Sequence, residues 1–204
     1  MIETAKIVDG MEGFKGTFQQ FQCDPCVQAK AHQAPVSSEH DHRVTAVLDR
    51  AHTDLCGSFS KLSFGKSKYF GTWIDDYSRF LLVFFLFGKD GTFKSFKDYV
   101  ALCKQQLGKI PKILHSDRGG EYSSEEFMDF CKSHGIQQEF CASHTPQHNG
   151  VAERMNCTLC ESALAMCIAA NLSKMFWAEA IAYAAWIHNA TYTRSVDGAT
   201  PYKL

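Results

Sequence analysis

From residue 50 onward, short apolar runs alternate with amphipathic segments, and this alternation strongly limits the possible folds. The apolar runs predict β-strands at residues 51–55, 68–74, 80–87, 112–115 and 136–141. Apolar residues at helical spacing predict helices at residues 91–107, 123–135 and 149–170, and a last helix that follows a Ser173 cap. Ser123 and Glu126 have the spacing of a capping box at the second helix. This order predicts an α/β protein with a mixed five-stranded sheet flanked by helices.

Residues 1–47 differ from the rest of the chain. They are polar, rich in Gln, His and Ser, and only weakly periodic. Because such a segment has too few apolar residues for a core of its own, we expect it to be poorly ordered. The sequence therefore predicts an extension over residues 1–47 and a folded core over residues 48–204.

Charge and cysteine content narrow the classes of function. The net charge of −1 argues against binding to nucleic acid by bulk attraction, so local basic groups or metal ions would have to hold it. The nine cysteines form no disulfide-like framework, which predicts reduced thiols and an intracellular protein. The longest apolar run, at residues 80–87, is too short to span a bilayer, and no membrane partner is expected.

Three carboxylates stand at positions that a sheet protein uses for chemistry. Asp54 and Asp117 are each expected at the end of a strand, and Glu153 near the start of the long helix. Taken singly, such residues serve as turn formers or complement a helix dipole. Taken together, three converging carboxylates would repel one another unless cations sat between them, and hard oxygen ligands select Mg²⁺ or Mn²⁺. Two such ions could drive an in-line phosphodiester displacement.

The spacing of these carboxylates and several longer motifs resemble the integrases of copia-type LTR retrotransposons. Thirty-five residues separate Asp117 from Glu153, as in the D,D-35-E signature of retroviral-type integrase catalytic cores. The other motifs are HTDLCG (52–57), IDDYSR (74–79), SDRGGEY (116–122), TPQHNGVAER (145–154), FWAEA (176–180) and TPY (200–202). The resemblance covers about residues 20 to 204.

The resemblance implies a fold, a reaction and partners. It implies a ribonuclease H-like fold, catalysis by Asp54, Asp117 and Glu153 with two Mg²⁺ or Mn²⁺ ions, and insertion of element DNA into a host genome. The expected partners are double-stranded DNA, from element ends and target, and further copies of the chain. The expected location is the nucleus, after a cytoplasmic stage. Asn149, Arg154 and Asn156 are expected on the surface of the helix that faces DNA.

The turn after Asp117 fits this interpretation. Gly119 and Gly120 would let the backbone turn without a Cβ obstructing the site. Arg118 could contact phosphate or project into solvent, and the second is favoured. Asp75 and Asp76 lie between two predicted strands, where turn formation explains them better than metal binding.

The chain departs from the family pattern in three places. Cys23 and Cys26 are half of the expected zinc module, whose upstream His pair is absent. His32, His40 and His42 could substitute for that pair in principle, but His40 and His42 lie too close in sequence for the usual spacing, so Zn²⁺ binding stays possible at an incomplete site. Cys157 stands where the family usually has Arg. The chain ends where relatives continue, which predicts a fragment of a longer protein.

Two other functions are compatible with these features. A catalytically inactive or domesticated transposon-derived protein that binds DNA or assists assembly would explain the neutral charge and the half zinc site. A ribonuclease H-type nuclease shares the chemistry, but it usually needs a fourth carboxylate.

Overall fold

The computed structural model describes residues 23–29, 44–141, 150–193, 196 and 199–204 of the chain. Its centre is one five-stranded sheet in the order β3-β2-β1-β4-β5. The strands are β1 (Arg50–Gly57), β2 (Tyr69–Asp75), β3 (Leu81–Leu86), β4 (Ile113–Ser116) and β5 (Gln137–Phe140). Antiparallel pairs join β1 to β2 and β2 to β3, whereas β4 is parallel to β1 and to β5. The predicted mixed sheet is therefore confirmed.

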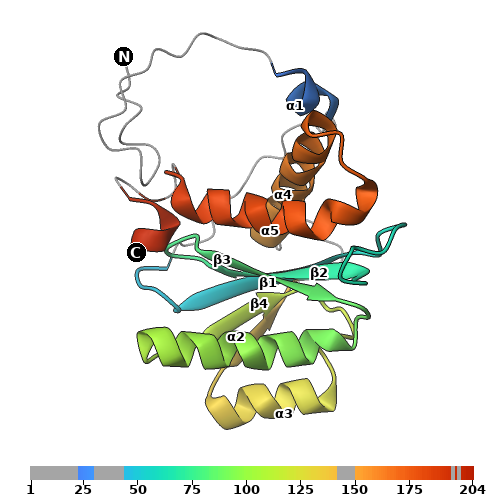
Figure 1. Ribbon diagram of the computed structural model, residues 1–204. Helices are drawn as coiled ribbons and strands as arrows, with labels where there is room; N and C mark the ends of the chain where they lie inside the picture. The colour runs from blue at the N-terminus through green and yellow to red at the C-terminus, as the bar shows by residue number, and fades with distance from the viewer. Residues whose placement is uncertain (1–22, 30–43, 142–149, 194–195, 197–198) are drawn as a thin grey trace.

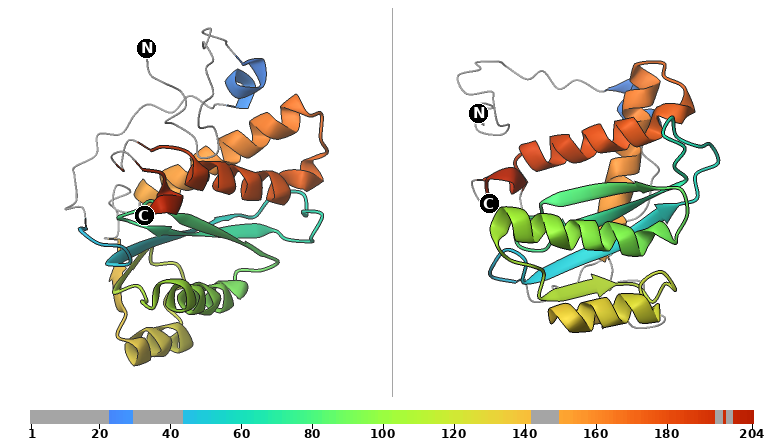
Figure 2. Two further views of the ribbon diagram at one scale, coloured as in Figure 1. Left: turned by 60° about the vertical axis from the view of Figure 1, so that its left-hand side comes forward. Right: turned by 60° about the horizontal axis from the view of Figure 1, so that its bottom comes forward.

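Helices cover both faces of this sheet (Figure 1, Figure 2). The helices α2 (Gly91–Leu107) and α3 (Glu125–His134) lie on one face, and α4 (Gly150–Ala169) and α5 (Trp177–Ala190) lie on the other. A short helix α1 (Asp24–Ala29) packs against α4. The single-turn segments η2 (Lys174–Phe176) and η3 (Pro201–Lys203) complete the described elements.

The hydrophobic core has two parts, one on each face of the sheet. Along β2, Trp73 packs with Phe96 of α2, whereas Phe70 and Ile74 pack with Ile181 of α5. Successive residues of a strand point to opposite faces, so one strand supplies both cores. By the same alternation Asp54, which contacts α4, and Cys56 lie on the α4 side of β1.

Three local predictions need correction. Asp54 lies in the middle of β1, not at its end. The cap of α3 is Ser124, whose Oγ accepts from the Phe127 N–H at 3.4 Å, whereas the Ser123 hydroxyl donates to the Gly119 carbonyl at 3.3 Å. Both serines have capping chemistry, and only the path of the preceding turn decides between them. Ser173 caps the η2 turn that precedes α5, rather than α5 itself.

The structure bears on two further expectations. Over the described residues, none of the helices combines the length and apolar character that crossing a membrane requires. The expected disorder of residues 1–47 concerns mostly residues 1–22 and 30–43, which lie outside the described residues, whereas Asp24–Ala29 form α1.

Candidate active site

Asp54 is held between β1 and α4. Its Oδ2 atom accepts a hydrogen bond of 2.9 Å from the side-chain amide of Asn156, which is only 4% exposed. The Asn156 Oδ1 atom accepts in turn from the Thr72 hydroxyl of β2 at 3.0 Å. Because an ionised carboxylate can only accept, the amide nitrogen must face Asp54 and the amide oxygen must face Thr72. Asn156 therefore orients Asp54.

Asn156 is a correction to the sequence analysis. It was expected on the helix surface as a DNA contact, but it is buried and both ends of its side chain are occupied. Its position three residues after Glu153 places the two side chains on one helix face. Glu153 is exposed at the start of α4, whereas Asn156, one turn later, is buried against the sheet.

The pKa of Asp54 depends on two neighbouring carboxylates. Burial, the charge of Asp117 and the charge of Glu153 together raise the pKa of Asp54 from 3.8 to about 6, against the opposing effect of hydrogen bonds from the Asn156 side chain and the Leu55 backbone. A negative charge raises the pKa of a carboxyl group only when it lies nearby. Asp117 and Glu153 are therefore close enough to Asp54 to act on it electrostatically. The three carboxylates come from three elements, because Asp117 directly follows β4 and Glu153 lies in the first turn of α4.

Asp117 begins a turn with two glycines, and a side chain would be crowded at only one of them. The Gly119 N–H donates to the Asp117 Oδ1 atom at 3.0 Å. A Cβ on Gly119 would lie 3.0 Å from that oxygen and 2.8 Å from Glu121 Oε2, so the Glu121 side chain would have to move away and Asp117 would have to shift by a few tenths of an ångström. A Cβ on Gly120 would meet nothing within 4 Å, so the expectation that both glycines clear the site holds for Gly119 alone.

Two further side chains lie near the three carboxylates and were not among the site residues predicted from the sequence. Tyr122 is buried, its hydroxyl lies 3.3 Å from Thr53 Oγ1, and burial followed by the charges of Asp54 and Asp117 raises its pKa. Burial raises the pKa of Cys141 to about 11, with contributions from Asp117, Glu153 and Asp54. Tyr122 closes the motif SDRGGEY, whereas Cys141 directly follows β5, whose pairing with β4 brings it to the site.

Asp75 and Asp76 have structural roles, as expected. Asp75 accepts hydrogen bonds from the Leu48 N–H at 2.7 Å and from the Ser78 N–H at 2.8 Å, which closes the turn between β2 and β3. Asp76 lies 3.0 Å from the guanidinium of Arg79 and 3.3 Å from His52 Nε2.

The remaining candidates for DNA contact are exposed or lie outside the described residues. Arg154 is exposed, and its Nε donates to the Gly150 carbonyl at 2.9 Å. Arg118 is exposed, as expected, and so is Cys157. Asn149 lies outside the described residues.

Metal binding was predicted at two sites, the three carboxylates and the pair Cys23 and Cys26. No group of three or more His, Cys, Asp or Glu side chains is placed to hold a metal ion in the described part of the chain. The charges of Asp117 and Glu153 thus act on Asp54, although the three side chains do not form a closed coordination sphere. Cys23 directly precedes α1 and Cys26 lies within it, and neither forms a disulfide, whereas His32, His40 and His42 lie outside the described residues.

The sequence is similar to known proteins over most of its length. Residues 35–146 match the family model described as the integrase core domain. The chain is 43% identical over 167 residues to the retrovirus-related Pol polyprotein from transposon TNT 1-94 of Nicotiana tabacum, covering 82% of this chain and 12% of that protein. It is 26% identical over 183 residues to the Pol polyprotein from transposon RE2 of Arabidopsis thaliana, covering 89% of this chain and 12% of that protein. The chain therefore spans a small part of these relatives.

Solved structures share the fold. A chain of the simian T-cell lymphotropic virus intasome in complex with PP2A regulatory subunit B56 gamma superposes with a TM-score of 0.65 at 19% identity, covering 89% of this chain and 62% of that one. The HTLV-2 integrase catalytic core domain in complex with magnesium superposes with a TM-score of 0.56 at 22% identity, covering 76% of this chain and 95% of that one. The ribonuclease H-like fold and the resemblance to copia-type elements are thus confirmed, and the chain belongs to the integrase core domain family.

Proposed function

We propose that this chain is the catalytic core of a transposable-element integrase, a polynucleotidyl transferase that processes DNA 3′ ends and transfers them to target DNA. Asp54, Asp117 and Glu153 are its catalytic residues. The observation that carries the proposal is the match to the integrase core domain over residues 35–146, together with the placement of Asp54 on β1, Asp117 directly after β4 and Glu153 in the first turn of α4. A fold that keeps three mutually repelling carboxylates together retains a cost in stability that a bound cation would remove.

The donor set fits a divalent metal. Carboxylate oxygens are the ligands that Mg²⁺ and Mn²⁺ prefer, and Asp54, Asp117 and Glu153 would hold them. Two such ions, when bound, supply activation of the attacking oxygen and stabilisation of the leaving oxygen in phosphodiester displacement.

The residues around the carboxylates prepare the site. Asn156 donates to Oδ2 of Asp54, and the Leu55 backbone also hydrogen-bonds to this carboxylate, so its position is fixed. The Gly119 N–H does the same for Asp117. Positions held by hydrogen bonds need no reorganisation when a ligand arrives, which favours catalysis.

DNA binding must rely on local groups, because the net charge is −1. Arg154 directly follows Glu153, and Arg118 directly follows Asp117. Both arginines are exposed. Guanidinium groups bind phosphate oxygens well and fix the register of a duplex. The proposed partners are double-stranded DNA and further copies of the chain, and the proposed place of action is the nucleus.

The test is a strand-transfer assay on the purified chain with a duplex that carries the element end. We expect product with Mg²⁺ or Mn²⁺, and a loss of at least about 100-fold for Asp117→Asn. The control is Asp129→Asn, the same substitution at an exposed position of α3, which should retain activity. Cleavage of RNA–DNA hybrids without strand transfer would favour a ribonuclease H-type nuclease. DNA binding without either reaction would favour a non-catalytic protein.

Metal binding is tested separately by calorimetric titration with Mn²⁺. We expect the wild-type chain to take up the ion and Asp117→Asn to bind it far more weakly, because a carboxylate ligand becomes a neutral amide. Equal uptake by the two proteins would contradict the assignment of Asp117.

A further inference from the structure

Two cysteines face each other across the contact between β1 and α4. The Sγ atoms of Cys56 and Cys160 lie 4.0 Å apart, although the residues are 104 positions apart in sequence. Both side chains are partly buried, and both are free thiols. The pair lies outside the set of residues that the proposed reaction uses.

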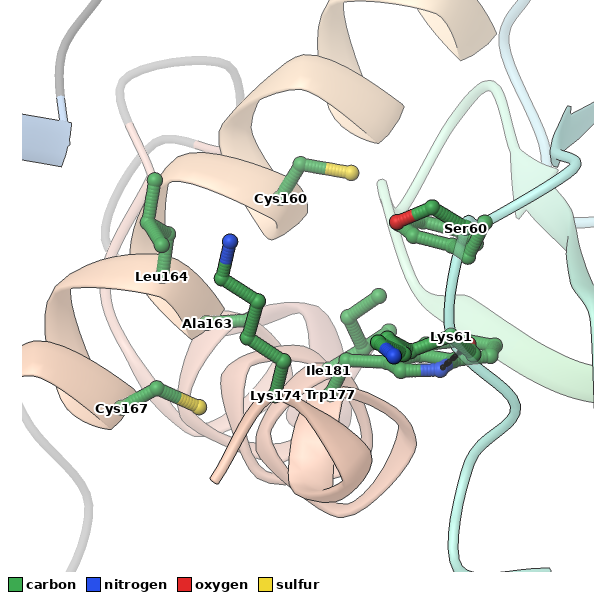
Figure 3. A pocket seen from close by; sticks show the side chains of 10 residues that line it. Ser60, Lys61, Cys160, Ala163, Leu164, Cys167, Lys174, Trp177 and Ile181 are labelled. Carbon is green, nitrogen blue, oxygen red and sulfur yellow. Dashed lines mark hydrogen bonds between the residues drawn. The ribbon is translucent and has the colours of Figure 1, made fainter. Parts of the chain in front are cut away.

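A pocket gives reagents access to one of the two sulfurs. It has a volume of about 280 Å³ and lies between α4, α5 and the segment that follows β1. Figure 3 shows the sulfur of Cys160 directed into this pocket, with the amino groups of Lys61 and Lys174 also at its lining. Cys160 lines the pocket and Cys56 does not, so Cys160 is the sulfur that a reagent meets first. The two lysines favour an anionic reagent.

The pair lies one step from the carboxylate site. Cys56 follows Asp54 by two residues, which places both side chains on the same face of β1. Cys160 follows Asn156 by four residues, which places both on the same face of α4. The Cys56–Cys160 contact is therefore the next one along the same strand–helix contact that carries the bond from Asn156 to Asp54.

We propose that Cys56 and Cys160 are a reversible disulfide site that links oxidation to the state of the carboxylate site. The oxidant is a small anionic disulfide such as oxidised glutathione. The Cys160 thiolate attacks one sulfur of the reagent, which forms a mixed disulfide and releases one reduced thiol. The Cys56 thiolate then attacks the Cys160 sulfur, which forms the Cys56–Cys160 bond and releases the second thiol. Two protein thiols are oxidised and one reagent disulfide is reduced to two thiols.

The bond would alter the neighbouring contact. Disulfide sulfurs lie about 2.05 Å apart, so the two sulfurs must approach by roughly 2 Å from their present separation. The rotation of the two side chains, and any shift of β1 against α4, would take place beside Asp54 and Asn156. Because catalysis is sensitive to displacements of about 1 Å, we expect strand transfer to fall by about 10–100-fold on oxidation and to return on reduction. This effect on activity rests on the proposed function, whereas formation of the bond does not.

The experiment treats the folded 204-residue chain with oxidised glutathione and maps disulfides by mass spectrometry without reduction. We expect a Cys56–Cys160 linked peptide whose mass is lower by two hydrogen atoms, and a Tm higher by roughly 5–15 °C because the bond closes a long loop. Cys160→Ser should lose both effects and keep the activity of the reduced protein. Cys167→Ser is the matched control, since Cys167 lines the same pocket on the same helix, and it should behave as wild type.

The outcomes separate the two proposals. Absence of the linked peptide, or linkage of Cys160 to another cysteine, would overturn the disulfide site. A Cys56–Cys160 bond that leaves strand transfer unchanged would overturn the link to the carboxylates. If the reduced protein shows no strand transfer, the proposed function fails, while the peptide map and the Tm still decide whether the site exists.

Discussion

Asp54 makes the metal-free protein less stable at neutral pH, and its replacement by asparagine should reveal how much. Burial and two neighbouring carboxylates raise its pKa from 3.8 to about 6. The folded state therefore holds a proton that the unfolded chain releases. This contribution to stability is fully present below about pH 4 and is lost as the pH rises through about 6. An asparagine at this position keeps an oxygen that can accept from Asn156, but it carries no charge at any pH.

The expected magnitude follows from the pKa shift. A rise of about two units at about 1.36 kcal/mol per unit corresponds to a cost of about 3 kcal/mol near pH 8. Near pH 5 the folded carboxyl is mostly protonated, and the same linkage leaves a cost of about 1.6 kcal/mol. The stability advantage of Asp54→Asn over wild type should therefore grow by about 1.4 kcal/mol between these pH values.

Urea unfolding in the presence of a chelator measures this difference. Wild type and Asp54→Asn are compared at about pH 5 and about pH 8, so that other titrating groups cancel to first order. Asp129→Asn serves as control and should differ from wild type equally at both pH values. If the advantage of Asp54→Asn is the same at both pH values, the inferred clustering of charge is wrong. Addition of Mg²⁺ should stabilise wild type and leave Asp54→Asn nearly unchanged, because only the former has a complete set of ligands.

Further substitutions at four positions test the surroundings of the carboxylates. Asn156→Ala should destabilise the fold by about 2–3 kcal/mol in urea unfolding and reduce strand transfer by at least about 10-fold, because it removes a hydrogen bond to a charged acceptor; unchanged activity would contradict the positioning role. Gly119→Ala should reduce strand transfer strongly, since its Cβ would lie 3.0 Å from Asp117 Oδ1, whereas Gly120→Ala should retain activity because its Cβ meets nothing within 4 Å. Arg154→Ala should lower DNA affinity and reduce the slope of log affinity against log salt by about 1, and Arg154→Lys should keep most of the slope; identical slopes for all three proteins would remove Arg154 from the interface.

Much of the fold was predictable because it depends on local periodicity. The helix expected at residues 91–107 is α2 with the same bounds, and each expected strand is present within two residues at either end. Apolar residues at spacings of two or near 3.6 specify which face of an element is buried whatever its partner is. The order of the elements then leaves few sheet topologies, of which a mixed sheet is the observed one.

The carboxylates of the site were also predictable, though only in part. Asp117 and Glu153 lie where strand end and helix start were expected, and the charges of both act on Asp54. The place of Asp54 within β1 was not predictable, because the strand continues to Gly57 through pairing with β2. A strand ends where its ladder ends, and the partner strand is distant in sequence.

Only the tertiary structure decided which groups meet across these elements. Asn156 was expected on the helix surface from its spacing to Glu153, but the packing of α4 on the sheet turns it toward Asp54 and Thr72. The same packing brought Cys160 to Cys56. Sequence by itself determines the elements, the face that each buries and the set of acidic side chains, because those follow from local spacing. Contacts between residues about a hundred positions apart depend on the rotation and depth at which a helix sits on a sheet, which the whole core sets together.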